Sequence, residues 1–117
     1  MRRIIKSITT GHGVVADCWE VNNVSVRLNS DKTGYVASGN VSLYVNHQAQ
    51  LDQKVILDNA TFNFDMTIAE VVSDTEKAIY DKLLLANIVD GVETNTLQTS
   101  HSGTVSLVGG VYHELQA

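Results

Sequence analysis

The residues TFNFDMT, at positions 61–67, give the strongest constraint on what this chain can fold into. Phe62, Phe64 and Met66 alternate there with polar residues, and several other segments alternate in the same way. Successive side chains of an extended strand point to opposite faces of a sheet, so this pattern is typical of strands that bury one face. It predicts an antiparallel sheet with one face on a core and the other in water.

A first hairpin is expected between residues 24 and 46. Residues 24–28 put apolar side chains on one face, and residues 35–46 repeat the alternation after a short polar stretch, NSDKTG at 29–34. Gly34 closes that stretch, and glycine readily adopts the positive φ that many tight turns need. The pattern therefore predicts two paired strands joined by a turn at 29–34.

A second hairpin is expected further along the chain. The segment KVILD at 54–58 leads through Asn59 and Ala60 into the strand at 61–67. Residues 92–99, VETNTLQT, alternate more weakly, and we expect them to return to the sheet.

Between these segments the apolar period changes from two to that of a helix. Ile79, Leu83 and Ala86 fall on one helical face, which predicts a single helix over about residues 74–88, packed on the sheet. Gly91 follows as a stop signal.

The sequence offers two starts for this helix. Ser73 with Glu76 forms a capping-box pattern, and Thr67 with Glu70 forms an earlier one. Both starts are open at this point.

The length of 117 residues indicates one domain with a single core. Together the patterns predict an α+β fold, mainly an antiparallel β-sheet or sandwich with one α-helix packed on it. We expect residues 1–98 to form a single β-rich domain. Residues 99–117 contain glycines together with Val105, Leu107 and Val111, and we expect either a C-terminal arm on a neighbouring subunit or the last strand.

The charge balance argues against nucleic acid as a partner. The net charge is −5, and the cations Arg2, Arg3 and Lys6 lie at the N-terminus, so the rest of the chain is more acidic than the total. Nucleic-acid binders need a basic face that neutralises phosphates. Only 18% of the residues are charged, which suits a surface covered by neighbours, and we expect a homo-oligomer.

The sequence also indicates a compartment. Cys18 is the single cysteine, so no disulfide within the chain is expected. MRRIIKSITT does not read as a signal peptide, and the longest apolar stretch, LLLANIV at 83–89, is far shorter than a membrane span. We therefore expect a protein made in a reducing cytoplasm, with no membrane as a partner.

The stretch TTGHGVVADCWEV, at 9–21, holds residue types that hydrolases use: His12, Asp17 and Cys18. Glycines on both sides of His12 predict a turn, and the alternation that follows puts Asp17 and Cys18 on opposite faces of a strand. The three side chains then do not converge. We expect Cys18 to be a small core residue and Trp19 an anchor of the core or of a sheet face.

No other chemistry stands out in the sequence. The histidines lack a ligand spacing such as His-x-x-x-His, and a single cysteine cannot build a zinc site. These histidines are His12, His47, His101 and His113. No glycine-rich phosphate loop and no Gly-x-Ser-x-Gly elbow is present in the sequence. We predict that the protein is not an enzyme, with no catalytic, cofactor-binding or metal-binding residues and no cofactor.

The order of these features resembles a group of small tailed-bacteriophage proteins found among tail and tail-fibre genes. Their Thr-x-His-Gly turn and following aromatic strand are similar to TTGHGVVADCW, and their Val-x-Val-x-Tyr strand and polar loop are similar to NVSLYVN and HQAQLDQ. An alternating aromatic strand, FNFDMT, and a helix, EKAIYDKLLLA, follow in the same order. The resemblance covers about residues 3–95, and none of its motifs is catalytic.

The resemblance implies a virion structural protein of the tail, the baseplate or a fibre, whose partners are other virion proteins and copies of itself. A capsid cement or decoration protein is an alternative, and a small carbohydrate- or protein-binding module is a candidate of another class. For that module, Tyr44 and Trp19 are the aromatic candidates. Expected inter-subunit contacts are Arg2, Arg3, Lys6, Tyr44, Val105, Leu107, Val111 and Tyr112.

Overall fold

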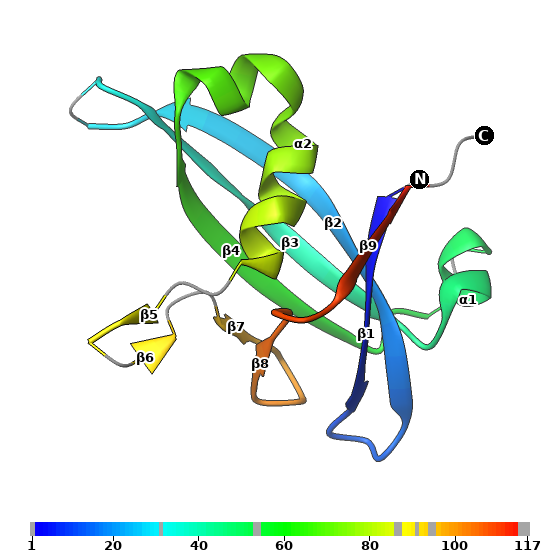
Figure 1. Cartoon of the computed structure of the whole chain (residues 1–117). Coiled ribbons are helices and arrows are strands. Elements are labelled where there is room, and N and C mark those ends of the chain that lie inside the picture. The colour runs from blue at the N-terminus through cyan, green and yellow to red at the C-terminus, as the bar shows by residue number, and fades with distance from the viewer. Residues whose placement is uncertain are drawn as a thin grey trace.

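The computed structural model describes residues 2–30, 32–52, 55–85, 88–90, 92–93 and 96–114. Five strands form the main sheet, all neighbours antiparallel, in the order β4-β3-β2-β1-β9. These strands are β1 (Arg2–Thr9), β2 (Val15–Leu28), β3 (Tyr35–Tyr44), β4 (Asp58–Met66) and β9 (Val111–Glu114). The sheet therefore contains both the first and the last described strand, which lie side by side (Figure 1).

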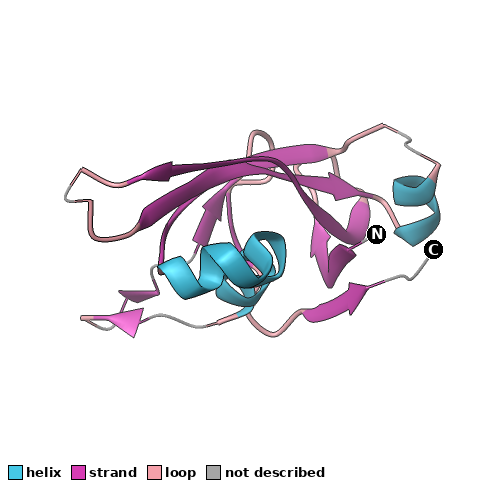
Figure 2. Ribbon diagram, turned by 90° about the horizontal axis from the view of Figure 1, so that it is seen from above, coloured by secondary structure: helices cyan, strands magenta, loops and turns pink. Residues whose placement is uncertain are grey.

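Two helices and two small sheets accompany this sheet. Figure 2 shows the sheet arching over the long helix α2 (Ile68–Leu84). The short helix α1 (His47–Leu51) lies at one end of the sheet (Figure 1). Two small sheets pair β5 (Ile88–Val89) with β6 (Val92–Glu93), and β7 (Thr96–Gln98) with β8 (Thr104–Ser106). The predicted α+β fold, mainly an antiparallel sheet with a helix packed on it, is confirmed.

The core lies between the sheet and α2. Several of its large side chains have no exposed surface: Trp19, Leu43, Ile79, Tyr80 and Leu83. Burying one large apolar side chain stabilises the fold by roughly 1.5–3 kcal/mol. The phenol of Tyr80 also joins the helix to the sheet, because it accepts a hydrogen bond from the Val21 N–H at 2.8 Å and donates one to the Arg2 carbonyl at 3.0 Å.

The first expected hairpin is present, with its turn at residues 29–34 between β2 and β3. Among the described residues of this turn, which leave out residue 31, the one with a positive φ is Lys32, at 57°, and not Gly34 as expected. The side chain of Asn29 supports this turn, because its carbonyl oxygen accepts a hydrogen bond from the Thr33 N–H at 3.2 Å.

The second expected hairpin is wrong. Residues 58–66 form one continuous strand, β4, in which Asn59 and Ala60 pair with β3 instead of turning. Residues 55–57 form no strand, and residues 53–54 lie outside the described part of the chain. The long strand β3 supplies ladder hydrogen bonds along the whole of β4, and a turn at Asn59 would remove some of them.

Helix α2 starts at the earlier of the two expected caps. The Thr67 hydroxyl accepts a hydrogen bond from the Glu70 N–H at 3.2 Å, and the Glu70 carboxylate accepts one from the Thr67 N–H at 2.8 Å. A break follows at Asp74, whose φ of −155° and ψ of 92° are not helical. Asp74, and not Ser73, caps the second part of the helix, because its carboxylate accepts from the Lys77 N–H at 3.1 Å.

Two further expectations about the helices need correction. Helix α2 ends at Leu84, earlier than expected, while Ala86 and Gly91 lie outside the described residues. The fold also has a second helix, α1, in a segment that reads as a polar loop. Asn46 caps it by accepting a hydrogen bond from the Ala49 N–H at 2.9 Å.

Residues 92–99 do not return to the main sheet as a strand. They contain β6, which pairs with β5, and the start of the β7–β8 hairpin. One isolated bridge joins Thr99 to Ala60 of β4. The weak alternation of this segment therefore reflects a small separate hairpin beside the main sheet.

The C-terminal segment packs onto its own chain. The side chains of Val105 and Leu107 are only 8% and 0% exposed, within the core. Strand β9 pairs along β1. Lys6 holds the connection that precedes β9 by donating from Nζ to the carbonyls of Ser106 and Val108, both at 2.6 Å. Two outcomes were expected for this segment, an arm on a neighbouring subunit or the last strand, and β9 is the last strand.

Candidate functional site

Uncharged polar side chains line part of the face of the main sheet that points away from the core. Residues paired across neighbouring antiparallel strands share a face, so Asn40 lies with Thr61, and Ser38 lies with Asn63. Asn22 of β2 joins the same row, because it pairs with Asn40. Amide and hydroxyl groups therefore lie next to one another across three strands.

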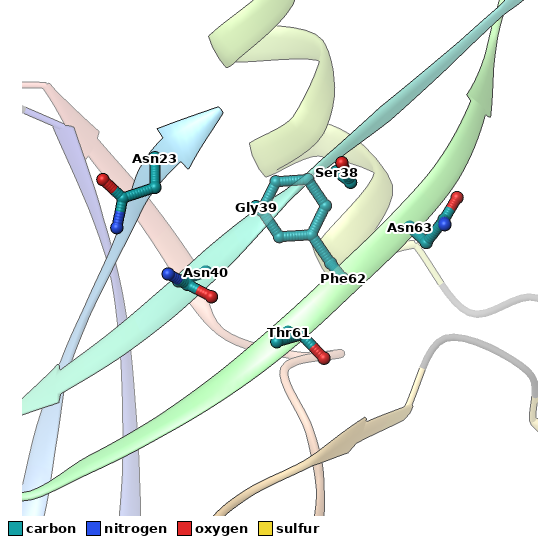
Figure 3. Close-up of a pocket in the computed structure, with 7 residues that line it drawn as sticks. All are labelled: Asn23, Ser38, Gly39, Asn40, Thr61, Phe62 and Asn63. Carbon is teal, nitrogen blue, oxygen red and sulfur yellow. The ribbon is translucent and has the colours of Figure 1, made fainter. Parts of the chain in front are cut away.

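A shallow hollow of about 480 Å³ opens at this part of the sheet. Its lining, shown in Figure 3, consists of Asn23, Ser38, Gly39, Asn40, Thr61, Phe62 and Asn63. A bulge in β2 lies beside it, since the pairing shifts between Asn22 and Ser25, and Asn23 has a φ of 54°. Gly39 permits the close approach of β2, because a Cβ atom there would lie 2.8 Å from the Asn22 carbonyl oxygen.

The lining of this hollow contains no ionisable side chain. It therefore supplies no general acid or base for catalysis. Its amides and hydroxyls both donate and accept hydrogen bonds, which suits an uncharged polar ligand. Phe62, the aromatic residue of the lining, is 5% exposed and offers little of its ring for stacking.

A second hollow, of about 220 Å³, lies beside the turn at His12. The ring centroids of His12 and His101 are 5.1 Å apart, and Asp58 lines the same hollow. The Asp58 carboxylate accepts hydrogen bonds from the N–H groups of Asn59 at 2.8 Å, Ser100 at 2.9 Å and His101 at 3.1 Å. It therefore holds the loop that carries His101. Within the described part of the chain, no three His, Cys, Asp or Glu side chains are grouped to hold a metal ion.

The structure places Cys18 and His12 in different surroundings. Cys18 is fully buried in a small cluster with Tyr44, and its Sγ–H donates to the side-chain oxygen of Gln50 at 3.2 Å. His12 is exposed and packs against His101. The prediction that Cys18 is a small core residue is confirmed, and no nucleophile–base pair forms between these two side chains.

We expect Cys18 to be unreactive in the folded protein. Burial raises the pKa of its thiol to about 11, so very little thiolate exists at neutral pH. Iodoacetamide at neutral pH should modify Cys18 rapidly only after the protein is unfolded in urea, as intact mass measurement will show. Rapid labelling of the folded protein would contradict this and restore a nucleophilic role to Cys18.

Gln50 of α1 organises the buried polar groups at one end of the sheet, and sequence reasoning missed it. Its side-chain oxygen accepts a hydrogen bond from Arg3 at 3.1 Å, and its amide donates to the Glu20 carboxylate at 2.6 Å. Gln50 and Arg3 are 0% and 4% exposed. These partners all belong to this chain, so the cluster stabilises the fold. The signal that could have located it is Asn46, a helix cap before HQAQL.

The residues expected to contact other subunits differ in their burial. Four of them are buried within their own chain and leave almost no surface for a second one: Arg3, Tyr44, Val105 and Leu107. Arg2 pairs with the Asp74 carboxylate at 2.6 Å, and Lys6 holds two carbonyls as described above. Tyr112 is partly buried, and Val111 is 54% exposed. For the exposed members, contact with other subunits stays a prediction.

Neither aromatic candidate for a sugar-binding module is available at the surface. Tyr44 is 3% exposed and Trp19 is 0% exposed. Stacking on a sugar needs an accessible ring face, so this part of the expectation needs correction.

The second half of β2 is the most exposed part of the main sheet. Residues 23–28 are all exposed, and their apolar members, Val24, Val26 and Leu28, are 37%, 37% and 49% exposed. The pairing with β1 reaches only to Trp19, so residues 22–28 face no described strand on that side. On the other side, Asn22 and residues 25–28 pair with β3. We call residues 22–28 the open edge. Figure 1 shows this end of β2 turning into β3 through a loop that extends beyond the sheet.

No helix in the described part of the chain has the length and apolar character needed to span a membrane. The chain shows no significant match to a protein-family model, a curated protein or a solved structure. What it does must therefore follow from its own residues and surfaces.

Proposed function

We propose that this protein is a non-enzymatic structural subunit of a tailed-bacteriophage particle, associated with the tail, the baseplate or a fibre. The open edge of β2 is the observation that carries this proposal. An exposed strand edge with apolar side chains is a ready site for pairing with another chain, and monomeric proteins protect such edges. A subunit of an assembly can leave such an edge for a neighbour.

The chemistry of the described side chains agrees with a role in assembly. The one thiol, Cys18, is buried, and the carboxylate of Asp58 is occupied by backbone N–H groups. The larger hollow has no ionisable lining. The order of motifs over about residues 3–95 is similar to that of small phage tail proteins, and this resemblance supports a place in a phage particle.

Gold-labelled antibody against this protein, viewed on purified phage particles by electron microscopy, tests the proposal. We expect label at the tail end, with pre-immune antibody as the control. Label on the head would replace the tail role with that of a capsid cement or decoration protein. Particles without any label would overturn the virion role.

The hollow near Asn40 favours a second candidate function, the binding of an uncharged carbohydrate. Titration of the ¹⁵N-labelled protein with neutral monosaccharides would then shift amide signals around the hollow. Asn40→Ala and Asn63→Ala should remove the shifts, while Ser7→Ala, an exposed change on β1, should not. An absence of shifts at millimolar sugar would exclude this candidate.

A further inference from the structure

The sequence of the open edge is complementary to itself in an antiparallel arrangement. We propose that it pairs with the open edge of a second copy of this chain, antiparallel, about a twofold axis at Val26. The inference deepens the proposed assembly function, and its place in a particle rests on that function. A continuous sheet through two copies, β4-β3-β2 followed by β2-β3-β4, would result.

The free backbone groups of the open edge belong to Val24, Val26 and Leu28. Successive residues of an antiparallel strand direct their N–H and C=O groups to opposite sides. The N–H of Asn29 donates to the Gly34 carbonyl across the hairpin at 3.0 Å, so the backbone N–H and C=O groups of Asn29 point toward β3. By alternation, Val24, Val26 and Leu28 point away from β3, toward the side where no described strand lies.

These residues form a self-complementary row. With the axis at Val26, this residue lies opposite Val26 of the second copy, and Val24 lies opposite Leu28 of the second copy. Each such pair exchanges two backbone hydrogen bonds, and the apolar side chains of both copies meet on one face. On the other face, Arg27 lies opposite Ser25 of the second copy, so each guanidinium meets a hydroxyl.

The charge distribution favours a second copy as the occupant. The net charge of −5 makes most surfaces of two copies repel each other. Residues 22–28, NNVSVRL, contain no carboxylate, and Arg27 is their one charged residue. These seven residues also lack the lysine, glutamate or proline that would keep outward-pointing positions from pairing. Two copies can therefore approach at this edge without repulsion between carboxylates.

Val26→Pro tests the pairing most directly. Proline removes the outward-pointing N–H of Val26 and leaves the hydrogen bonds to β3 intact, as it does on natural edge strands. In sedimentation velocity over a concentration series, we expect the wild-type chain to form a dimer and Val26→Pro to weaken it by at least about tenfold. Circular dichroism and a melting curve check that the variant folds.

A second pair of variants keeps the test independent of how proline is tolerated. Val26→Lys places two ammonium groups opposite each other at the axis and should also abolish the dimer. Val72→Lys, at a valine on α2 that is 73% exposed, is the matched control and should leave the dimer unchanged. A wild-type chain that stays monomeric, or Val26 variants that dimerise like the wild type, would overturn the twofold pairing.

The two proposals fail in different experiments. Gold label on the particle together with a monomeric chain in solution keeps the structural role and rejects the twofold pairing. A dimer that depends on Val26, with no label on any particle, rejects the virion role and keeps the pairing.

Discussion

Replacing Trp19 with alanine should lower the free energy of unfolding by roughly 3–5 kcal/mol. The side chain is fully buried, and its indole N–H donates to the Lys6 carbonyl at 3.0 Å. The variant loses the packing of the whole ring, creates a cavity and leaves that carbonyl without its partner. A domain of this size has a total stability of about 5–15 kcal/mol, so the loss is a large fraction of it. Urea unfolding followed by circular dichroism measures the change.

Two control variants are compared with Trp19→Ala. Trp19→Phe keeps an aromatic ring in the core and should lower the free energy of unfolding by less than alanine does. Val55→Ala changes a side chain that is 79% exposed and should stay within about 0.5 kcal/mol of the wild type. A loss below about 1 kcal/mol for Trp19→Ala would contradict the central position of this side chain.

Replacing Asp58 with alanine should lower the free energy of unfolding by about 2–4 kcal/mol, because partly buried N–H groups of Asn59 and His101 lose this acceptor and that of Ser100 keeps only the Asn59 carbonyl. Asp58 is 2% exposed, so water cannot easily replace its carboxylate. Asp65→Ala, an exposed position on the same strand, is the matched control and should change stability little. Chemical denaturation of both variants gives the comparison, and equal stabilities would contradict the role of Asp58 as an anchor.

The same carboxylate predicts a dependence of stability on pH. Burial raises the pKa of Asp58. Hydrogen bonds from the Ser102 side chain and from three backbone N–H groups lower the pKa and together outweigh burial, so the pKa lies below its usual value. A carboxyl with a lowered folded pKa stabilises the fold above its unfolded pKa of about 3.9 and loses this contribution as the pH falls through the folded pKa. Below about pH 4, stability should therefore fall more steeply in the wild type than in Asp58→Ala. Parallel slopes in urea titrations at several acidic pH values would exclude this carboxylate as the cause.

Local sequence patterns predicted the parts of the fold that local interactions decide. The turn at 29–34 and the alternating strand around 61–66 both occur in the structure. Asn59 and Ala60 show the limit of such reasoning, because they read as a turn but pair with β3. Register with a strand that lies far away in the sequence decided their conformation, and no local pattern contains that information.

The start of the helix shows the same division between local and distant causes. The sequence presents caps at Thr67 and Ser73, and the structure uses Thr67, while Asp74 in place of Ser73 caps the part of the helix that follows the break. The guanidinium of Arg2, in a distant part of the chain, pairs with the Asp74 carboxylate at 2.6 Å and at 2.8 Å. A contact across 72 positions could not be anticipated from the residues around either cap.

The sequence predicted the strand that carries the open edge, but it did not predict that this edge is exposed. The alternation predicted correctly that Val26 and Leu28 share a face of a strand, since they pair with Ala37 and Tyr35 of β3. Such a pattern indicates that one face is apolar and does not indicate what covers it. Pairing with β1 stops at Trp19, and these side chains stay exposed, so the same pattern marks a candidate contact surface in place of a core.

The pairing of β1 with β9 links folding to protein synthesis. Arg2 lies opposite Glu114, 112 positions later, so this pair of strands cannot form until nearly all of the described chain has left the ribosome. Contacts of such separation form late and slow the folding of a domain. A growing or prematurely ended chain therefore leaves one side of residues 2–5 of β1 unpaired, in addition to the open edge of β2. Incomplete chains therefore expose a side of β1 that β9 covers in the finished chain, which makes them more prone to aggregate.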